Sequence, residues 1–256
     1  MPYANNQGTR IHYEVEGQGP PLALGHGFSR SLASWRTFGY VEALKKDYRL
    51  VMISARGHGN SDKPHDPEAY DLKLRVGDVV AVLDDLGIDR AHYLGYSMGA
   101  GIGFGIAKYA PERFLSLMLG GMSPYRTESG DEYRTQIQRS LEGGMEAFVA
   151  RMEQTSGAVP PEEKARLLAN DVQALLAIRL AASPTDLADA LPSLALPCLL
   201  WAGDADPFHA GAEECVKHIP NATFVSLPGL VHTQAFTRSD LALPHITSFL
   251  AKVSRA

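Results

Sequence analysis

The chain has 256 residues, of which 45% are hydrophobic and 21% charged, with 24 Gly and 16 Pro. This composition indicates a globular protein with one large domain and excludes disordered, collagen-like and coiled-coil structures. The 24 basic and 29 acidic residues leave a net charge of −5, so no basic surface suited to nucleic acid is expected.

Cysteine usage and the start of the chain bear on the cellular compartment. Cys198 and Cys215 lie 17 residues apart without a CxxC or a neighbouring His pattern, which argues against a disulfide framework and a structural zinc. The first residues lack a basic segment followed by an apolar stretch, and no window reaches the ~18 consecutive apolar residues of a membrane span. We therefore expect a cytoplasmic protein with no membrane partner, no metal and no other cofactor.

Short apolar runs bounded by Gly and Pro predict buried strands, and helical patterns separate most of them. The predicted strands cover residues 10–16, 21–24, 49–53, 91–94, 115–119, 198–201 and 223–227. Apolar stripes predict helices over 72–86, 102–109 and 240–253. Because strands and helices alternate after the first two strands, the sequence predicts an α/β fold with a mostly parallel sheet.

Residues 125–193 interrupt this alternation. They contain no convincing strand but show helical patterns at about 131–141, 145–155, 162–180 and 186–191. Their 7 basic and 11 acidic residues give a balance of −4. We therefore expect a helical insert at 125–193 and one core domain made of residues 1–124 and 194–256.

The clearest chemical signal is the pentapeptide GYSMG, from Gly95 to Gly99, between the predicted strand 91–94 and a helix rich in small residues. A sharp turn from strand to helix strains the backbone at Ser97, and a glycine on either side avoids Cβ collisions. The hydroxyl is then exposed at the carboxyl edge of the sheet, and the Met98 amide points toward a developing oxyanion. The motif predicts that Ser97 is a nucleophile.

A nucleophilic serine needs a histidine to take its proton and an acid to orient that histidine. His232 follows the last predicted strand and precedes the last helix, which places it at the same sheet edge as Ser97. Asp204 and Asp206 both lie in the turn after strand 198–201. We choose Asp206, at the apex of the turn and 26 residues before His232, and keep Asp204 as the alternative.

A second backbone amide is needed to bind an oxyanion, and His26-Gly27-Phe28 follows an early strand where such an amide would lie. Phe28 is the predicted donor, paired with Met98. His26 and His58 are expected to support these loops by hydrogen bonding, not to take part in catalysis.

Taken together, these motifs resemble the α/β-hydrolase superfamily over essentially the whole chain. They comprise the order Ser, Asp, His, the HG motif after an early strand, the loop ARGHGNSD and the PERF after the nucleophile helix. The resemblance implies an eight-stranded sheet with a small helical cap, here residues 125–193, over the site. Within the superfamily, the chain resembles small bacterial serine esterases and enol-lactone hydrolases with compact caps.

The leading hypothesis is a cofactor-free serine hydrolase that cleaves an ester or a lactone through an acyl-enzyme on Ser97. Carbon-carbon bond hydrolysis and perhydrolysis are alternative reactions that the same three catalytic residues could perform. Dehalogenases and epoxide hydrolases of this fold resemble one another in using Asp as the nucleophile in the turn from strand to helix. Ser97 occupies that position here, which argues against both activities. A slow-turnover receptor for a small molecule is the competing class, and homo-oligomerisation is left open.

The cap bears on the substrate. A segment of about 70 residues with no basic surplus favours a small, largely neutral ester or lactone, although one buried Arg such as Arg126 or Arg179 could bind a carboxylate locally. Several large side chains in or beside the cap either line an apolar pocket or form the cap's own core. They are Met122, Tyr125, Tyr133, Met145, Phe148 and Met152.

Overall fold

The computed structural model describes residues 1–181 and 187–254, and its centre is a single eight-stranded sheet. The strands are β1 (Tyr3–Asn6), β2 (Thr9–Glu16), β3 (Pro21–Gly25), β4 (Arg49–Ile53), β5 (Ala91–Tyr96), β6 (Phe114–Gly120), β7 (Cys198–Gly203) and β8 (Ala222–Leu227). They lie in the order β1-β2-β4-β3-β5-β6-β7-β8. β1 and β2 pair antiparallel, as do β2 and β4, and all other pairs are parallel. The predicted α/β fold with a mostly parallel sheet is confirmed.

The middle of the sheet is covered on both faces. Every residue of β5 and β7 is buried, and so is all of β6 except Leu115. Continuous apolar runs of this kind are typical of parallel strands between two helical layers. The edge strand β1 was not predicted, because its sequence YANN is polar and only Ala4 and Asn6 are buried.

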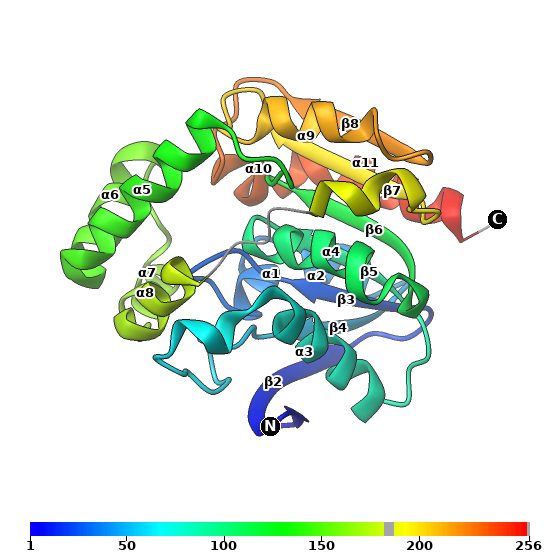
Figure 1. Ribbon diagram of the computed structural model, residues 1–256, viewed down its shortest axis with the longest axis horizontal. Coiled ribbons are helices and arrows are strands. Elements are labelled where there is room, and N and C mark those ends of the chain that lie inside the picture. The colour runs from blue at the N-terminus through cyan, green and yellow to red at the C-terminus, as the bar shows by residue number, and fades with distance from the viewer. Residues whose placement is uncertain (182–186, 255–256) are drawn as a thin grey trace.

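Helices form a layer on each face of the sheet (Figure 1). One layer contains α3 (Leu72–Asp85), α4 (Met98–Tyr109) and α9 (His209–Val216), whose apolar side chains share one buried cluster with the sheet. The other contains α1 (Ala33–Thr37), α2 (Tyr40–Leu44), α10 (Gln234–Thr237) and α11 (Ser239–Val253), packed around a second cluster. Short 3-10 helices, η1 (Pro67–Tyr70) and η2 (Pro111–Arg113), lie in the connections.

Between β6 and β7 the described residues form four further α-helices, and Figure 1 shows them gathered at one end of the sheet. They are α5 (Glu128–Glu142), α6 (Gly144–Ser156), α7 (Pro161–Leu168) and α8 (Val172–Leu180). A third buried cluster joins them to one another and to Met98. We keep the name cap for residues 125–193, and its division from the core stays a prediction.

The single helix predicted over 162–180 is wrong. The structure has α7 and α8 instead, with a break at 169–171. The Asp171 carboxylate accepts hydrogen bonds from the Gln173 and Ala174 amides, so it caps the N-terminus of a new helix. The pattern predicted over 186–191 corresponds to the 3-10 helix η3 (Leu187–Ser193), and residue 186 lies outside the described residues.

A buried ion pair connects the cap to the core. The Arg30 guanidinium, in the loop after β3, lies 2.6 Å from Glu163 of α7, and both side chains are buried. The Ser34 hydroxyl donates to the same carboxylate oxygen. The guanidinium also lies over the rings of Phe38 and Phe236. Because both charges are removed from water, each depends on the other for its stabilisation.

Among the described helices, none combines the length and the apolar character needed to cross a membrane.

Candidate active site

Ser97 lies at the junction between β5 and α4, in a backbone conformation that side chains rarely adopt. Its φ is 52° and its ψ is −112°. A Cβ atom at Gly95 would come within 2.5 Å of the Gly99 carbonyl oxygen, and one at Gly99 within 2.0 Å of the Gly25 carbonyl oxygen. The glycines on both sides of Ser97 therefore permit the close packing that the strained turn requires, as the sequence predicted.

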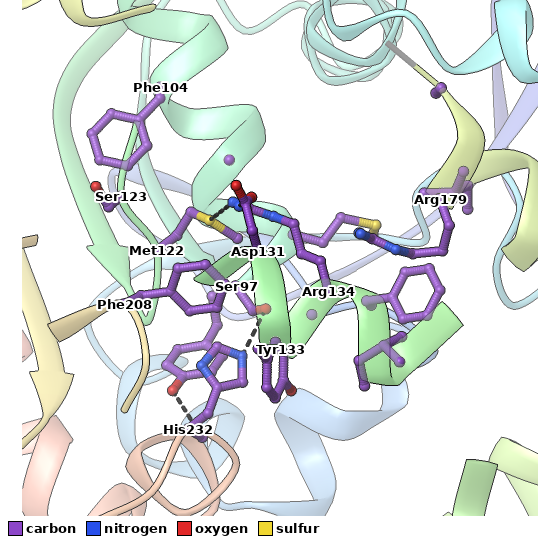
Figure 2. Close-up of a pocket in the computed structure, with 18 of the residues that line it drawn as sticks. Ser97, Phe104, Met122, Ser123, Asp131, Tyr133, Arg134, Arg179, Phe208 and His232 are labelled. Atoms are coloured by element: carbon purple, nitrogen blue, oxygen red, sulfur yellow. Dashed lines mark hydrogen bonds and ion pairs between the residues drawn. The ribbon is translucent and has the colours of Figure 1, made fainter. Parts of the chain in front are cut away.

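The structure brings Ser97, His232 and Asp206 together. The His232 Nε2 atom lies 2.9 Å from Ser97 Oγ, and its Nδ1 atom lies 2.8 Å from Asp206 Oδ2 (Figure 2). Because an ionised carboxylate can only accept, Nδ1 carries the proton and Nε2 is free to accept the Ser97 hydroxyl. This arrangement lets the imidazole take a proton from the serine while the carboxylate stabilises the resulting charge.

The two candidate acids have different surroundings. The Asp206 side chain is fully buried, and its second oxygen accepts a hydrogen bond from the Phe208 amide at 2.9 Å. Asp204 is exposed and accepts from the Gly229 amide at 2.8 Å, in the loop that leads to His232. Asp206 is therefore the acid in contact with the imidazole, and Asp204 holds two loops together.

Aromatic side chains enclose His232, which is 8% exposed. Its ring centroid lies 5.1 Å from Tyr133, 5.4 Å from Phe208 and 5.5 Å from Tyr96. The Tyr96 hydroxyl also donates to the His232 carbonyl oxygen, and burial raises the pKa of that tyrosine. This packing limits the imidazole to one orientation, in which it reaches both Ser97 and Asp206.

The two amides predicted to bind an oxyanion lie on segments next to Ser97. Phe28 follows β3, and Met98 is the first residue of α4, where helix geometry leaves the amide without an intrahelical partner. Within the described residues, neither amide donates a hydrogen bond. Both are therefore available to a ligand.

The neighbouring histidines have the structural role expected of them. His26 Nε2 accepts from the Ala55 amide at 3.0 Å, and His58 Nε2 accepts from the Ser29 amide at 3.1 Å. Burial lowers the pKa of His26 to about 4 and that of His58 well below its usual value. Both rings are therefore neutral supports of the loop that carries Phe28.

A cavity of about 470 Å³ opens in front of Ser97 and His232. Of the six large side chains considered from the sequence, five line it: Met122, Tyr125, Tyr133, Phe148 and Met152. Met145 is instead buried in the core of the cap. No group of three or more His, Cys, Asp or Glu side chains in residues 1–181 and 187–254 is arranged to hold a metal ion.

Charged side chains also reach the cavity. Arg134 pairs with Asp131 at 3.0 Å, and Figure 2 shows both beside Met122. Arg179 extends into the cavity from α8. Arg126 is 70% exposed and pairs with Asp131, so the sequence-based expectation of a buried arginine there is wrong. Arg179 is half-buried and its Nε atom is fully buried, while carboxylate binding by this residue stays a prediction.

Sequence reasoning missed Arg134, Asp131 and Phe208 as residues of this site. Phe208 lies two residues after Asp206 in the same turn, so its position could have suggested a contact with the imidazole. Arg134 and Asp131 lie on the cap helix α5, and the apolar periodicity of that helix does not show which of its polar side chains border the cavity.

Comparisons with known proteins identify the family of the chain. A model of the alpha/beta hydrolase fold matches residues 20–196. The chain is 28% identical to the putative 2-succinyl-6-hydroxy-2,4-cyclohexadiene-1-carboxylate synthase of Bacillus subtilis, over 95% of this chain and 96% of that one. It is 27% identical to a putative non-heme chloroperoxidase of Synechocystis, over 98% of this chain and 100% of that one. The crystal structure of the enol-lactonase from Burkholderia xenovorans LB400 is similar with a TM-score of 0.83 and 25% identity, covering 98% of this chain and 100% of that one. The chain therefore belongs to the α/β-hydrolase fold family.

Proposed function

We propose that this protein is a serine hydrolase that cleaves a small carboxylic ester or lactone through an acyl-enzyme on Ser97. One observation carries the proposal: Ser97 Oγ, the two ring nitrogens of His232 and Asp206 Oδ2 form an unbroken chain of contacts of 2.9 and 2.8 Å. A serine hydroxyl is a poor nucleophile by itself, and this chain supplies the base that activates it.

In the first half of the reaction, Ser97 Oγ attacks the carbonyl carbon while His232 Nε2 takes the hydroxyl proton. The negative charge that develops on the carbonyl oxygen is stabilised by the amides of Phe28 and Met98. The bond from carbon to the leaving oxygen then breaks, and His232 returns the proton to that oxygen. An alcohol leaves; in a lactone, the new hydroxyl stays attached to the acyl group.

In the second half, His232 takes a proton from water, whose oxygen attacks the acyl-enzyme. The proton passes back to Ser97 Oγ as the ester bond to the serine breaks, and a carboxylic acid is released. Asp206 keeps Nδ1 as the protonated nitrogen throughout. These steps use only side chains and amides of this chain and water, so no cofactor is needed.

The dimensions of the cavity support a small substrate. Its volume of about 470 Å³ lies at the lower end of the range for sites that bind small molecules, ~300–1,000 Å³. Aromatic and methionine side chains from the core and the cap form much of its wall. The similarity to an enol-lactonase supports including lactones among the substrates.

Perhydrolysis is a second candidate, favoured by the Synechocystis relative named as a putative chloroperoxidase. In this reaction hydrogen peroxide replaces water as the attacking molecule in the second half, and a peroxy acid is released. The same serine, histidine and amides would be used, so the two activities differ only in which small nucleophile enters the cavity.

The test is to measure turnover of p-nitrophenyl esters with acyl chains of two to sixteen carbons, together with a panel of lactones. Ser97→Ala serves as the control for hydrolysis that does not involve the site. We expect activity to peak on short esters or on a lactone and to vanish in the control. A peak on the longest chains would contradict the small substrate. No turnover on any compound would favour the receptor hypothesis over the enzyme.

A further inference from the structure

The cavity in front of Ser97 has an excess of positive charge. Among the described residues that line it there are five arginines and one acidic residue, Asp131. Asp131 is shared by Arg126 and Arg134, and the cavity-lining Arg30 pairs with Glu163. The remaining two cavity arginines, Arg75 and Arg179, make no ion pair with any residue in the described ranges.

Arg179 is the clearest case. Its Nε atom is buried and has no hydrogen-bond partner within residues 1–181 and 187–254. Figure 2 shows its side chain extending into the cavity from the cap, on the side opposite Met122. A buried donor without a partner is unfavourable, and a buried charge without a counter-ion is more so. The folded chain therefore holds a guanidinium whose partner is not one of its own described residues.

The guanidinium of Arg134 adds to the electrostatic cost of burying the positive charge of Arg179. Burial, followed by the positive charge of Arg134, lowers the pKa of Arg179 to about 10, so the group is still charged at neutral pH. Among the described residues, Asp131 is the one carboxylate that pairs with Arg134, and it is shared with Arg126, so the positive charges of Arg134 and Arg179 are not neutralised. An anion bound between the cap and Ser97 would supply the missing negative charge.

We propose that Arg179 binds a carboxylate of the substrate and that the positive charge of Arg134 strengthens this binding. The ester or lactone cleaved at Ser97 then carries a carboxylate remote from the reacting carbonyl. This rests on the proposed function and names the substrate class within it. A carboxylate fits because the planar guanidinium can donate two parallel hydrogen bonds to its two oxygens.

The proposal departs from the largely neutral substrate expected from the sequence. That expectation used the balance of −4 over residues 125–193, which includes carboxylates that do not line the cavity. Glu162, for example, is 90% exposed. The charge that a substrate meets is set by the side chains that face the cavity, and there the arginines are in excess.

The test compares two substrates of nearly equal size, mono-p-nitrophenyl glutarate and its neutral methyl ester, with wild type, Arg179→Gln and Arg179→Lys. Arg139→Gln is the matched control, since Arg139 is an exposed cap arginine on α5 that does not line the cavity. We expect Arg179→Gln to lower kcat/KM for the anionic ester by roughly ten- to a hundredfold, mainly through KM, and for the neutral ester by less than about threefold. Arg179→Lys should recover part of the preference, and Arg139→Gln should change neither value.

Equal losses on both esters in Arg179→Gln, or no preference for the anionic ester in wild type, would overturn the carboxylate subsite and leave the hydrolase function standing. Failure of wild type to hydrolyse either ester would count against the hydrolase function alone. The subsite is then decided by calorimetric binding of monomethyl glutarate to Ser97→Ala. Binding that is lost on adding Arg179→Gln supports it, and equal binding or none in both proteins contradicts it.

Discussion

Asp204 and Asp206 lie two residues apart in one turn, yet only the Asp206 carboxylate reaches the imidazole of His232, at 2.8 Å. Asp204 binds the Gly229 amide instead. A hydrogen bond to Nδ1 determines which ring nitrogen can act as a base, so these neighbouring carboxylates should differ sharply in their effect on activity.

We expect Asp206→Asn to lower kcat by about 10³- to 10⁴-fold, because an amide can donate to Nδ1 and so favour the wrong tautomer. Asp204→Asn is the matched control and should retain activity within about threefold, since an amide oxygen can still accept from Gly229. Steady-state kinetics on a short-chain ester checks both. Greater loss in Asp204→Asn would reassign the acid.

Ser97→Ala should lower kcat by ~10⁴-fold or more, because it removes the atom that forms the acyl-enzyme. The fold should be unaffected, and circular dichroism with thermal unfolding is the control for that. Mass spectrometry adds a direct measurement: wild type treated with a fluorophosphonate should gain one adduct on the peptide that contains Ser97, and the variant should gain none. Retention of more than about a per cent of kcat would exclude Ser97 as the nucleophile.

The ion pair between Arg30 and Glu163 predicts a stability effect. Glu163→Gln leaves the buried Arg30 without its counter-ion, and we expect the free energy of unfolding to fall by about 3–5 kcal/mol. Replacing both residues with Met should cost less than the single change, because no unpaired charge remains buried. Urea unfolding measures these differences. Glu162→Gln, at a side chain that is 90% exposed, is the control and should have little effect.

Stability should also depend on pH through the buried histidines. The pKa of His26 is lowered to about 4, and that of His58 lies well below its usual value, mainly because of burial. Below a pH of about 6.5, the unfolded chain binds protons that the folded chain does not. The free energy of unfolding should therefore fall as the pH decreases from about 6.5 to 4, by about 1.4 kcal/mol per pH unit for each such histidine.

Urea unfolding at several pH values and constant ionic strength measures this pH dependence of the free energy of unfolding. The exposed His245 on α11 provides a control. His245→Gln should leave the slope between pH 4 and 6.5 nearly unchanged. A free energy of unfolding that stays constant over this range would contradict the neutral state inferred for His26 and His58.

The chain positions of Ser97, Asp206 and His232 could be predicted because each lies within five residues after a strand whose apolar run is easily recognised. The carboxyl ends of neighbouring parallel strands meet at one edge, so local sequence was sufficient to place these residues together. The break between α7 and α8 could also have been found, since Asn170-Asp171 is a capping signal inside the predicted helix.

Other features could not be derived in this way. The edge strand β1 depends on pairing with β2, and its own sequence favours no strand. The approach of Arg179 and Arg134 depends on how two cap helices are rotated against each other, which is decided by packing over the whole cap. Periodicity shows which face of a helix is apolar, but it does not show which polar residue borders a cavity.

The close contact between Gly99 and the Gly25 carbonyl has a practical consequence for protein engineering. The backbones of the segment that leads to Phe28 and the segment that carries Met98 lie so close together that no side chain fits between them at Gly99. Cavity-lining cap residues such as Met152 and Arg179 could then be exchanged to redesign selectivity while the reacting groups keep their positions, whereas Tyr133 packs on His232 and should be kept. A library of variants confined to cap residues that line the cavity without packing on His232 should yield many altered preferences and few inactive enzymes.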